Sequence, residues 1–360
     1  MKKIRTIFPV LFVLIAMIIV FTHCGESISE KTEAPGELTE LQKRTLTFIS
    51  PLPEHAFEEG MNQSQEIIDL GKMLFFEPRI SKSGLISCNT CHNMATFGVD
   101  QLPVSVGHGW QKGPINAPTV LNAAFHISQF WDGRAADVEE QAGMPILDKL
   151  EMAATEEHVL AVLASMPEYV ERFRAAFPDQ EEPLIYENVG NAIGAFERIL
   201  VTPSPFDEFL KGNANALTQE QKKGLEVFLD VGCQACHRGV ALGGDMFAFF
   251  KTPKERETGE AHPGRFGFTE READKHFFKV PSLLNIAKTY PYLHDGSVWS
   301  LAETVNIVAK DMLSKELTEE QTQLIVAFLH SLTGEIPAYA LEIPILPPST
   351  PQTPRPRFDI

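Results

Sequence analysis

Two short strings of residues carry the most specific chemistry in this sequence. Each has the pattern Cys-x-x-Cys-His, at residues 88–92 and again at residues 233–237. In an exported protein this pattern attaches haem c, because the two thiols add to the porphyrin vinyl groups and the adjacent histidine ligates the iron. The sequence therefore predicts two covalently bound haems. Their attachment residues are Cys88, Cys91 and His92 for the first haem, and Cys233, Cys236 and His237 for the second.

Two Cys-x-x-Cys pairs have other known uses, which the rest of the sequence disfavours. A redox-active pair needs a thioredoxin-like βαβ setting, and little alternating strand pattern is present. A zinc site is disfavoured by export and by the histidine that follows each pair. The chain has five cysteines and the fifth is Cys24, so none remains for a disulfide framework. Haem attachment is the favoured reading.

Export is predicted from the N-terminus. Residues 1–23 combine a basic start with an apolar run over residues 7–21, which is typical of a signal peptide and short for a membrane-spanning helix of about 20 residues. Cys24 and the polar stretch after it resemble a bacterial lipoprotein cleavage site, with Cys24 lipidated. An uncleaved anchor and ordinary signal cleavage are the alternatives. We expect a periplasmic protein that contacts the membrane only through such an anchor.

Composition and charge restrict the class of protein. With 44% hydrophobic and 22% charged residues, the chain is typical of a globular protein and not of a disordered or multi-span membrane protein. The formal net charge is −17, and cleavage before Cys24 would remove Lys2, Lys3 and Arg5 but no acidic residue. Such a chain is not expected to bind nucleic acid, although its field could steer a basic protein partner.

The segments around the two strings have the apolar spacing of amphipathic helices. One helix is expected over residues 64–76 with Ser64 as N-cap, and another opens at Thr218 with Gln221 as its capping-box partner. Further helices are expected over residues 187–200, 305–312 and 316–332.

A repeated detail indicates an internal duplication. Gly71 and Phe75 precede the first haem string, and Gly224 and Phe228, at the same spacing, precede the second. The predicted fold class is therefore mainly α, with two cytochrome c-like haem domains that have long loops and are related by duplication.

Breaks in the helical pattern divide the chain. A tether is expected over residues 24–47, an N-terminal haem domain over 48–202 and a C-terminal haem domain over 203–336. Residues 337–360 hold seven prolines, too many for a helix or a sheet, so this tail should cover the surface as extended chain.

Several segments outside the haem strings closely resemble the bacterial di-haem cytochrome c peroxidases. They are residues 104–110, 116–125 and 130–135 in the first half, and 225–236, 280–283 and 289–299 in the second. The resemblance covers about residues 48–335. It implies reduction of hydrogen peroxide to water at the N-terminal haem, with electrons that enter at the C-terminal haem from a small cytochrome c or cupredoxin. It also implies a homodimer.

The resemblance implies roles for residues around the N-terminal haem. Glu151 and Gln141 stand at the family's distal-pocket positions, where a carboxylate can move a proton between the peroxide oxygens and an amide can orient the peroxide. An isolated Glu151 would otherwise be read as a solvated surface charge. His108, between two glycines, matches the resting sixth ligand of this haem, in a loop that could swing away. Trp131 matches an electron relay between the haems.

Two further assignments follow from the same resemblance. Asn116, Thr289 and Pro291 match an interdomain calcium site, where oxygen ligands suit a hard cation. At the C-terminal haem the family's axial methionine position falls on Val308, which cannot ligate iron. Met312, on the same helical face, is the expected replacement, with Met246 as second choice and an open iron as the third possibility.

Two other functions stay open. A relative of the methylamine dehydrogenase maturation enzyme would oxidise tryptophan in a protein, but that subclass has a distal tyrosine ligand, and no tyrosine occurs between Tyr292 and Tyr339. A plain di-haem electron carrier would need both irons six-coordinate and would not need Glu151 or Gln141. A peroxidase is favoured over both.

Overall fold

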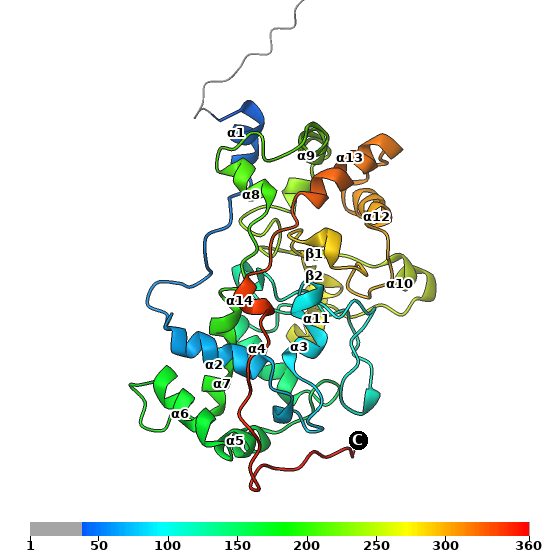
Figure 1. Cartoon of the computed structure of the whole chain (residues 1–360). Coiled ribbons are helices and arrows are strands. Elements are labelled where there is room, and N and C mark those ends of the chain that lie inside the picture. Colours follow the sequence, from blue (N-terminus) through cyan, green and yellow to red (C-terminus); the bar gives the residue numbers. More distant parts are fainter. Residues whose placement is uncertain (1–37, 360) are drawn as a thin grey trace, which may run out of the picture. The chain divides into compact units, whose positions relative to one another are not determined.

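The computed structural model describes residues 38–359 (Figure 1). The expected signal peptide, the expected lipidation at Cys24 and the first part of the expected tether lie outside these residues. Within the described part, no helix is long and apolar enough to cross a membrane.

The described residues form α-helices, short 3-10 helices and two short strands. The α-helices are α1 (Glu40–Leu46), α2 (Gln65–Phe75), α3 (Cys88–Cys91), α4 (Val138–Leu147), α5 (Glu156–Ala164), α6 (Pro167–Ala176), α7 (Tyr186–Glu197), α8 (Pro205–Leu210), α9 (Gln219–Val231), α10 (Pro253–Thr258), α11 (Phe266–Thr269), α12 (Leu301–Leu313), α13 (Glu319–His330) and α14 (Ala338–Leu341). The 3-10 helices are η1 (Pro78–Ile80), η2 (Met94–Thr96), η3 (His108–Trp110), η4 (Ala123–Phe125), η5 (Cys233–Ala235), η6 (Glu272–Asp274) and η7 (Ile286–Lys288). The strands β1 (Phe247–Phe249) and β2 (Phe277–Lys279) pair antiparallel.

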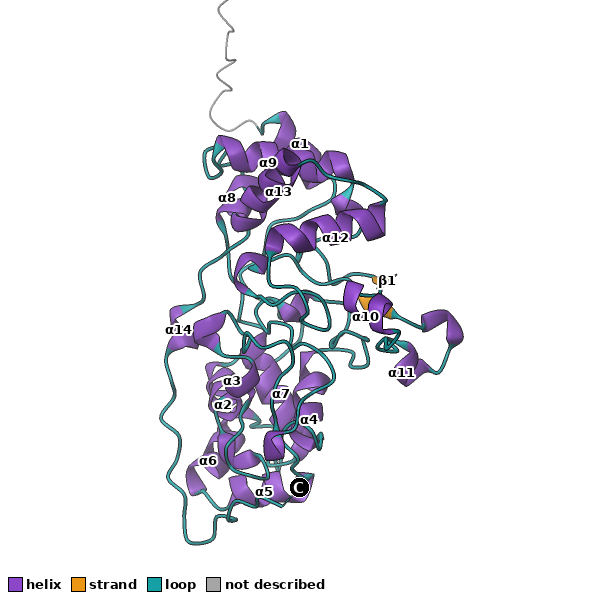
Figure 2. Cartoon of the chain, turned by 90° about the vertical axis from the view of Figure 1, so that its right-hand side faces the viewer, coloured by secondary structure: helices purple, strands orange, loops and turns teal. Residues whose placement is uncertain are grey.

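The buried apolar side chains form two cores, as expected for two haem domains. Helices α2, α4, α5, α6 and α7 supply most of the first core, and α8, α9 and α13 supply most of the second. Figure 2 shows these two groups of helices with long loops between them. The predicted fold class is confirmed: the structure is mainly helical, with one helical core for each half.

The expected helix starts are found where capping residues occur. Ser64 accepts a hydrogen bond from the backbone N–H of Ile67, and Thr218 forms a capping box with Gln221. Thr318 does the same for α13, so that helix begins at Glu319. These side chains satisfy backbone donors that have no partner inside the helix.

The duplication is visible where two helices of each core cross. In the first core a Cβ added to Gly71 of α2 would lie 1.7 Å from the carbonyl oxygen of Ala192 in α7. In the second, a Cβ added to Gly224 of α9 would lie 2.0 Å from the carbonyl oxygen of Leu324 in α13. Only glycine permits this approach.

A matching aromatic contact follows each glycine. Phe75 packs on Phe196 with ring centroids 5.4 Å apart, and Phe228 packs on Phe328 at 5.2 Å. The repeated Gly and Phe of the sequence are therefore the same helix crossing, built once in each half.

The two halves meet at a duplicated asparagine. Asn122 and Asn285 both have a left-handed backbone, with φ of 60°, and each donates through its side-chain amide to the hydroxyl of Thr202, at 2.7 and 2.8 Å. All three residues are buried. Thr202 therefore ties the corresponding loops of the two halves together.

Three features differ from the sequence-based picture. Residues 40–46, expected in a tether, form α1, whose Leu41 and Leu46 pack on the second core, and Ile49 and Leu52 belong to that core. The proline-rich tail is extended over most of its length but contains the four-residue helix α14, with Ala340 buried, so the expectation of no helix there was wrong. The β1–β2 pair was missed because three-residue strands are too short to show alternation.

Candidate haem pockets and active site

The proximal histidines of both haem strings are held in the same way. The Nδ1 atom of His92 lies 3.3 Å from the carbonyl oxygen of Gly98, and Nδ1 of His237 lies 3.1 Å from the carbonyl oxygen of Leu242. When Nδ1–H donates to a carbonyl, the other ring nitrogen is left as the metal-binding atom. Burial lowers the pKa of both imidazoles, which favours the neutral form that a metal requires.

The attachment cysteines are placed to receive covalent haem. Cys88 and Cys91 lie on α3, and Cys233 and Cys236 lie on or directly after η5, so each pair spans one helical turn. All four are free of disulfide bonds. Together with the oriented histidines, both strings fit haem c.

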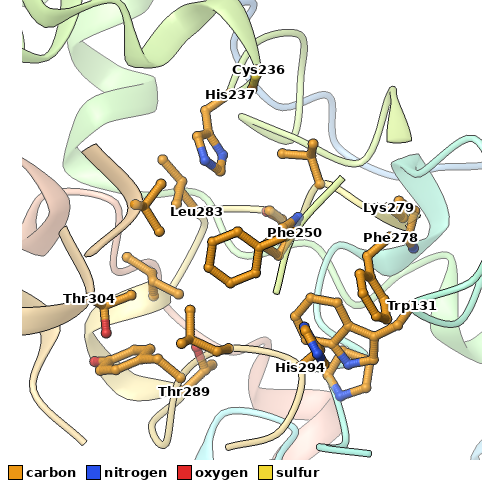
Figure 3. Close-up of a pocket in the computed structure, with 18 of the residues that line it drawn as sticks. Trp131, Cys236, His237, Phe250, Phe278, Lys279, Leu283, Thr289, His294 and Thr304 are labelled. Carbon is orange, nitrogen blue, oxygen red and sulfur yellow. The ribbon is translucent and has the colours of Figure 1, made fainter. Parts of the chain in front are cut away.

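An apolar cavity opens at the second string (Figure 3). Its walls include Cys236 and His237, side chains of α12 and the loop that follows β2. Among the candidate axial ligands, Met312 lines this cavity together with Val308, whereas Met246 is not among its lining residues. The structure thus brings Met312 to the haem cavity on the helix face that the sequence predicted.

A carboxyl with a shifted pKa lies near the first string. Burial raises the pKa of Glu151 to about 7, with a smaller contribution from Asp148, while Arg134 opposes the shift. Burial raises the pKa of the thiols of Cys88 and Cys91, and the charge of Glu151 adds a smaller contribution to both shifts. A half-buried carboxyl therefore lies close enough to the first attachment site to act on it electrostatically, and it is half protonated near neutral pH.

The His108 loop packs directly against the Glu151 loop. The backbone N–H of His108 donates to the carbonyl of Glu151 at 2.7 Å. A Cβ on Gly107 would lie 1.9 Å from the carbonyl oxygen of Leu150, so only glycine allows this packing. The structure therefore brings together two residues that the sequence placed at the same distal pocket.

The His108 imidazole is buried and engaged by the C-terminal tail. Its Nε2 atom lies 2.9 Å from the backbone carbonyl oxygen of Asp359. Lys82 fixes this end of the tail, because its Nζ forms an ion pair with the Asp359 carboxylate at 3.0 Å and its carbonyl accepts from the N–H of Arg357. Nothing in the sequence pointed to this contact.

Gln141 lies in the first half of α4 and is half-buried. In the described structure no hydrogen bond joins its side chain to Glu151 or His108. Its place in the distal pocket therefore stays a prediction.

Trp131 lies where the two halves meet. Its indole N–H donates to the carbonyl of Asn116 at 2.9 Å, and its ring packs edge-on against His294 at 6.1 Å. Trp131 and His294 each stand directly before an Asp-Gly pair, at residues 132–133 in the first half and 295–296 in the second. Trp131 and His294 are thus corresponding positions of the duplication, which the repeated Asp-Gly could have revealed.

His294 belongs to a buried group that the sequence did not single out. Its Nε2 atom lies 2.9 Å from Oε1 of Glu255, and its ring stacks on Phe278 at 4.0 Å. Both His294 and Glu255 are buried. This group fixes the ring against which Trp131 packs.

The three residues expected to bind calcium all line the same cavity. Asn116, Thr289 and Pro291 all contribute to the cavity at the second haem string. The Asn116 amide N–H groups donate to the carbonyls of Leu102 and Pro103, which leaves its oxygen as the available ligand atom. Within the described residues no cluster of three or more His, Cys, Asp or Glu could hold a metal ion. Amide and carbonyl oxygens would have to supply this site.

Comparisons with known proteins agree with this geometry. The family model for di-haem cytochrome c peroxidase matches residues 65–215, and the cytochrome c model matches residues 221–333. The chain is 48% identical over 321 residues to the cytochrome c551 peroxidase of Pseudomonas aeruginosa, covering 88% of this chain and 92% of the relative. It is 47% identical over 294 residues to the cytochrome c551 peroxidase of Nitrosomonas europaea, covering 81% and 87%.

A solved structure shares the fold. The crystal structure of a MauG-like protein associated with microbial copper homeostasis superposes with a TM-score of 0.71 at 27% identity, covering 81% of this chain and 97% of the other. The cytochrome c peroxidases are the more similar in sequence. On its two haem strings, its duplicated helical cores and these matches, the chain belongs to the di-haem cytochrome c peroxidase family.

Proposed function

We propose that this protein is a di-haem peroxidase that reduces hydrogen peroxide, with two electrons and two protons, to two molecules of water. The electrons come from a small donor cytochrome c or cupredoxin. The observation that carries this proposal is the half-buried Glu151 carboxyl beside the first haem string, with its pKa raised to about 7. An electron carrier has no use for a titrating carboxyl at that place.

In this proposal the N-terminal haem is the site of peroxide reduction. Its iron, when haem is bound, supplies a metal that can bind peroxide. Glu151 takes the proton from the near oxygen of peroxide and delivers it to the leaving oxygen, and Gln141 orients the substrate through its amide. A group whose pKa lies near neutral pH can both accept and donate this proton, because each protonation state is well populated.

His108 is proposed as the resting sixth ligand of that haem and as the part that moves. Gly107 and Gly109 flank it, and Gly109 has a left-handed φ of 64° inside η3. In the present structure the imidazole is hydrogen-bonded to Asp359. This contact supports a loop with two positions, one on the tail and one on the iron.

The C-terminal haem is proposed to receive electrons and to pass them on through Trp131. Met312 is its proposed axial ligand, supported by the place of that side chain in the cavity. A thioether ligand favours the reduced iron and suits an electron reservoir. Calcium is proposed to bind between the halves through oxygen atoms of Asn116, Thr289 and Pro291.

The remaining proposals concern the chain as a whole. We propose a periplasmic homodimer, anchored to the membrane through lipid on Cys24. The domain division is proposed at Thr202 and Pro203, with residues 40–52 attached to the C-terminal haem domain on the basis of their packing.

The direct test is peroxide turnover by the purified di-haem protein with a reduced donor cytochrome. We expect two donor molecules to be oxidised for each peroxide consumed. A donor that stays reduced would favour the plain electron carrier. Oxidation of protein tryptophan with little donor turnover would favour a maturation enzyme of the MauG type.

A further inference from the structure

A buried lysine lies beside the C-terminal haem cavity. Lys279, the last residue of β2, is 7% exposed. Its ammonium donates to the carbonyl of Ser128 at 2.7 Å and lies 3.0 Å from Nδ1 of His126. An ammonium has three N–H groups, and these contacts use two. Burial without a paired anion lowers the pKa of Lys279 to about 7, with Asp132 opposing the shift.

His126 presents a second donor to the same space. Because its Nδ1 accepts from Lys279, the imidazole proton is on Nε2. That nitrogen is buried and has no hydrogen-bond partner in the described structure. The fit of the ring requires Gly244, where an added Cβ would lie 2.3 Å from Cδ2 of His126. A buried donor without a partner is costly, so such a group usually marks a missing acceptor.

Both donors line the cavity that His237 and Cys236 also line. In Figure 3, Lys279 lies with Phe278 and Trp131 on one side of this cavity, and His237 and Cys236 lie on another. Haem c is joined to its cysteines through the vinyl edge of the porphyrin, so its two propionate carboxylates belong to the far edge. In an apolar cavity these anions need donors.

We propose that Lys279 and His126 together bind a propionate of the C-terminal haem and thereby set the reduction potential of that haem. The carboxylate accepts one hydrogen bond from Nζ of Lys279 and one from Nε2 of His126. The cation offsets the negative charge that the propionate places near the iron, and so favours the reduced state. This inference rests on haem attachment at Cys233 and Cys236, and it holds whether the protein is a peroxidase or an electron carrier.

The pair also has a purely structural use, which the test must separate. Lys279 joins β2 to the loop at residues 126–135, because its backbone N–H donates to the carbonyl of Trp131 at 2.7 Å and its ammonium reaches Ser128. A lysine that only ties these segments together would affect stability but not the haem carboxylate. The readouts must therefore report on the haem itself.

The experiment uses the full-length protein with both haems attached. The potential of each haem is measured by spectroelectrochemistry, and the propionate bending bands are measured by resonance Raman spectroscopy. The variants are Lys279→Gln, Lys279→Arg and His126→Leu. The matched control is Lys310→Gln on α12, which removes one cation from the same half at a side chain that is 70% exposed.

We expect Lys279→Gln to shift the reduction equilibrium of the C-terminal haem about tenfold toward the oxidised form, which is about 59 mV for one electron. His126→Leu should shift it in the same direction by less, and both variants should shift the propionate bands. Lys279→Arg should restore most of the potential, and Lys310→Gln should change neither quantity.

Unchanged potentials and unchanged propionate bands in Lys279→Gln would overturn the proposal. Lys279 would then serve only to join β2 to the loop at residues 126–135. If Lys279→Gln does not retain its haems, His126→Leu decides, because it keeps the lysine: wild-type bands and potential in that variant would contradict the proposal equally. Peroxide turnover is recorded in parallel. If Lys279→Gln loses peroxide turnover while the potential of its C-terminal haem is unchanged, that result counts against the role of Lys279 at the propionate. It does not count against the peroxidase function.

Discussion

In the first haem region the loop after α4 brings the half-buried Glu151 carboxyl near the attachment cysteines, whereas in the second region α12 lines the cavity with Val308 and Met312. The two helices are counterparts, because α4 follows Trp131 at the same separation at which α12 follows His294. The proximal sides match as well: each histidine is oriented by a carbonyl.

The two regions indicate which part of the duplicated unit determines the chemistry of each haem. Attachment, proximal ligation and the helix crossing at Gly71 and Gly224 are repeated nearly unchanged. The distal side has diverged: one half carries a titrating carboxyl near its haem string, and the other has an apolar cavity. A polar pocket with a local acid–base suits bond cleavage, and an apolar one with a thioether suits electron storage.

The largest expected effect comes from removing the acid–base of the first region. Glu151→Gln should lower peroxide turnover by a factor of roughly 10²–10⁴ while both haems stay attached, because an amide cannot carry the proton. Steady-state turnover and haem content measure the two quantities. The matched control is Glu157→Gln, an exposed acid in α5, which should leave turnover unchanged. Full activity of Glu151→Gln would remove this residue from the mechanism.

The pH dependence of peroxide turnover gives a second test of Glu151. The raised pKa of Glu151 means that the basic form, which must accept the peroxide proton, is lost as pH falls below about 7. Turnover per active enzyme should therefore decline on the acid side with an apparent pKa near 7, and Glu151→Gln should lack this limb. An identical acid limb in the variant would assign it to another group.

The second effect concerns the end of the tail, which contacts the His108 loop and Lys82 of the first region. Removing residues 357–360 takes away the Asp359 carbonyl that holds His108. We expect a larger low-spin fraction of the oxidised N-terminal haem, because the freed imidazole can bind the iron. Electron paramagnetic resonance measures this fraction. In a His108→Gly background the same truncation should have no effect on spin state, and a wild-type spin state in the truncated parent would contradict the expectation.

A third prediction addresses the second region. Met312→Leu should lower the potential of the C-terminal haem and abolish any thioether-to-iron charge-transfer band, because leucine keeps the apolar packing but cannot ligate. Spectroelectrochemistry and near-infrared absorption give the two readings. Met246→Leu is the matched control and should change neither. If Met312→Leu behaves as wild type, the ligand is another group.

How much of this picture could be predicted from the sequence depends on the range of the contacts. The helix starts at Ser64 and Thr218 depend on local contacts, because each cap side chain accepts a hydrogen bond from a backbone N–H three residues further on. The Gly–Phe unit is also a short pattern within one helix. The helix starts, the repeated Gly–Phe unit and the presence of two haems were predicted correctly.

Contacts between distant segments could not be predicted in this way. Lys279 and His126 are 153 residues apart in the sequence, and His108 and Asp359 are 251 residues apart. Neither pair has a spacing that marks it. The packing of α1 on the second core was not predicted either, because its short polar sequence is typical of a linker.

The smallest expected effect is that of calcium, which would join the two regions. Chelation should lower turnover and melting temperature modestly, and calcium, but not magnesium, should restore both, because the proposed ligands are amide and carbonyl oxygens in a loop that suits the larger ion. Turnover and thermal melting are measured on the same samples. No change in either after verified removal of the metal would argue against the site.

The central claim, that peroxide is reduced at the first haem with electrons held by the second, is tested most directly in one turnover. The enzyme is prepared with the C-terminal haem reduced and the N-terminal haem oxidised, and is mixed with one equivalent of hydrogen peroxide under stopped-flow absorption. We predict that the N-terminal haem spectrum changes first and that the C-terminal haem is then oxidised, the second step being slowed by Trp131→Phe. A first spectral change at the C-terminal haem, or its oxidation at a rate independent of the N-terminal haem, would contradict this division of labour.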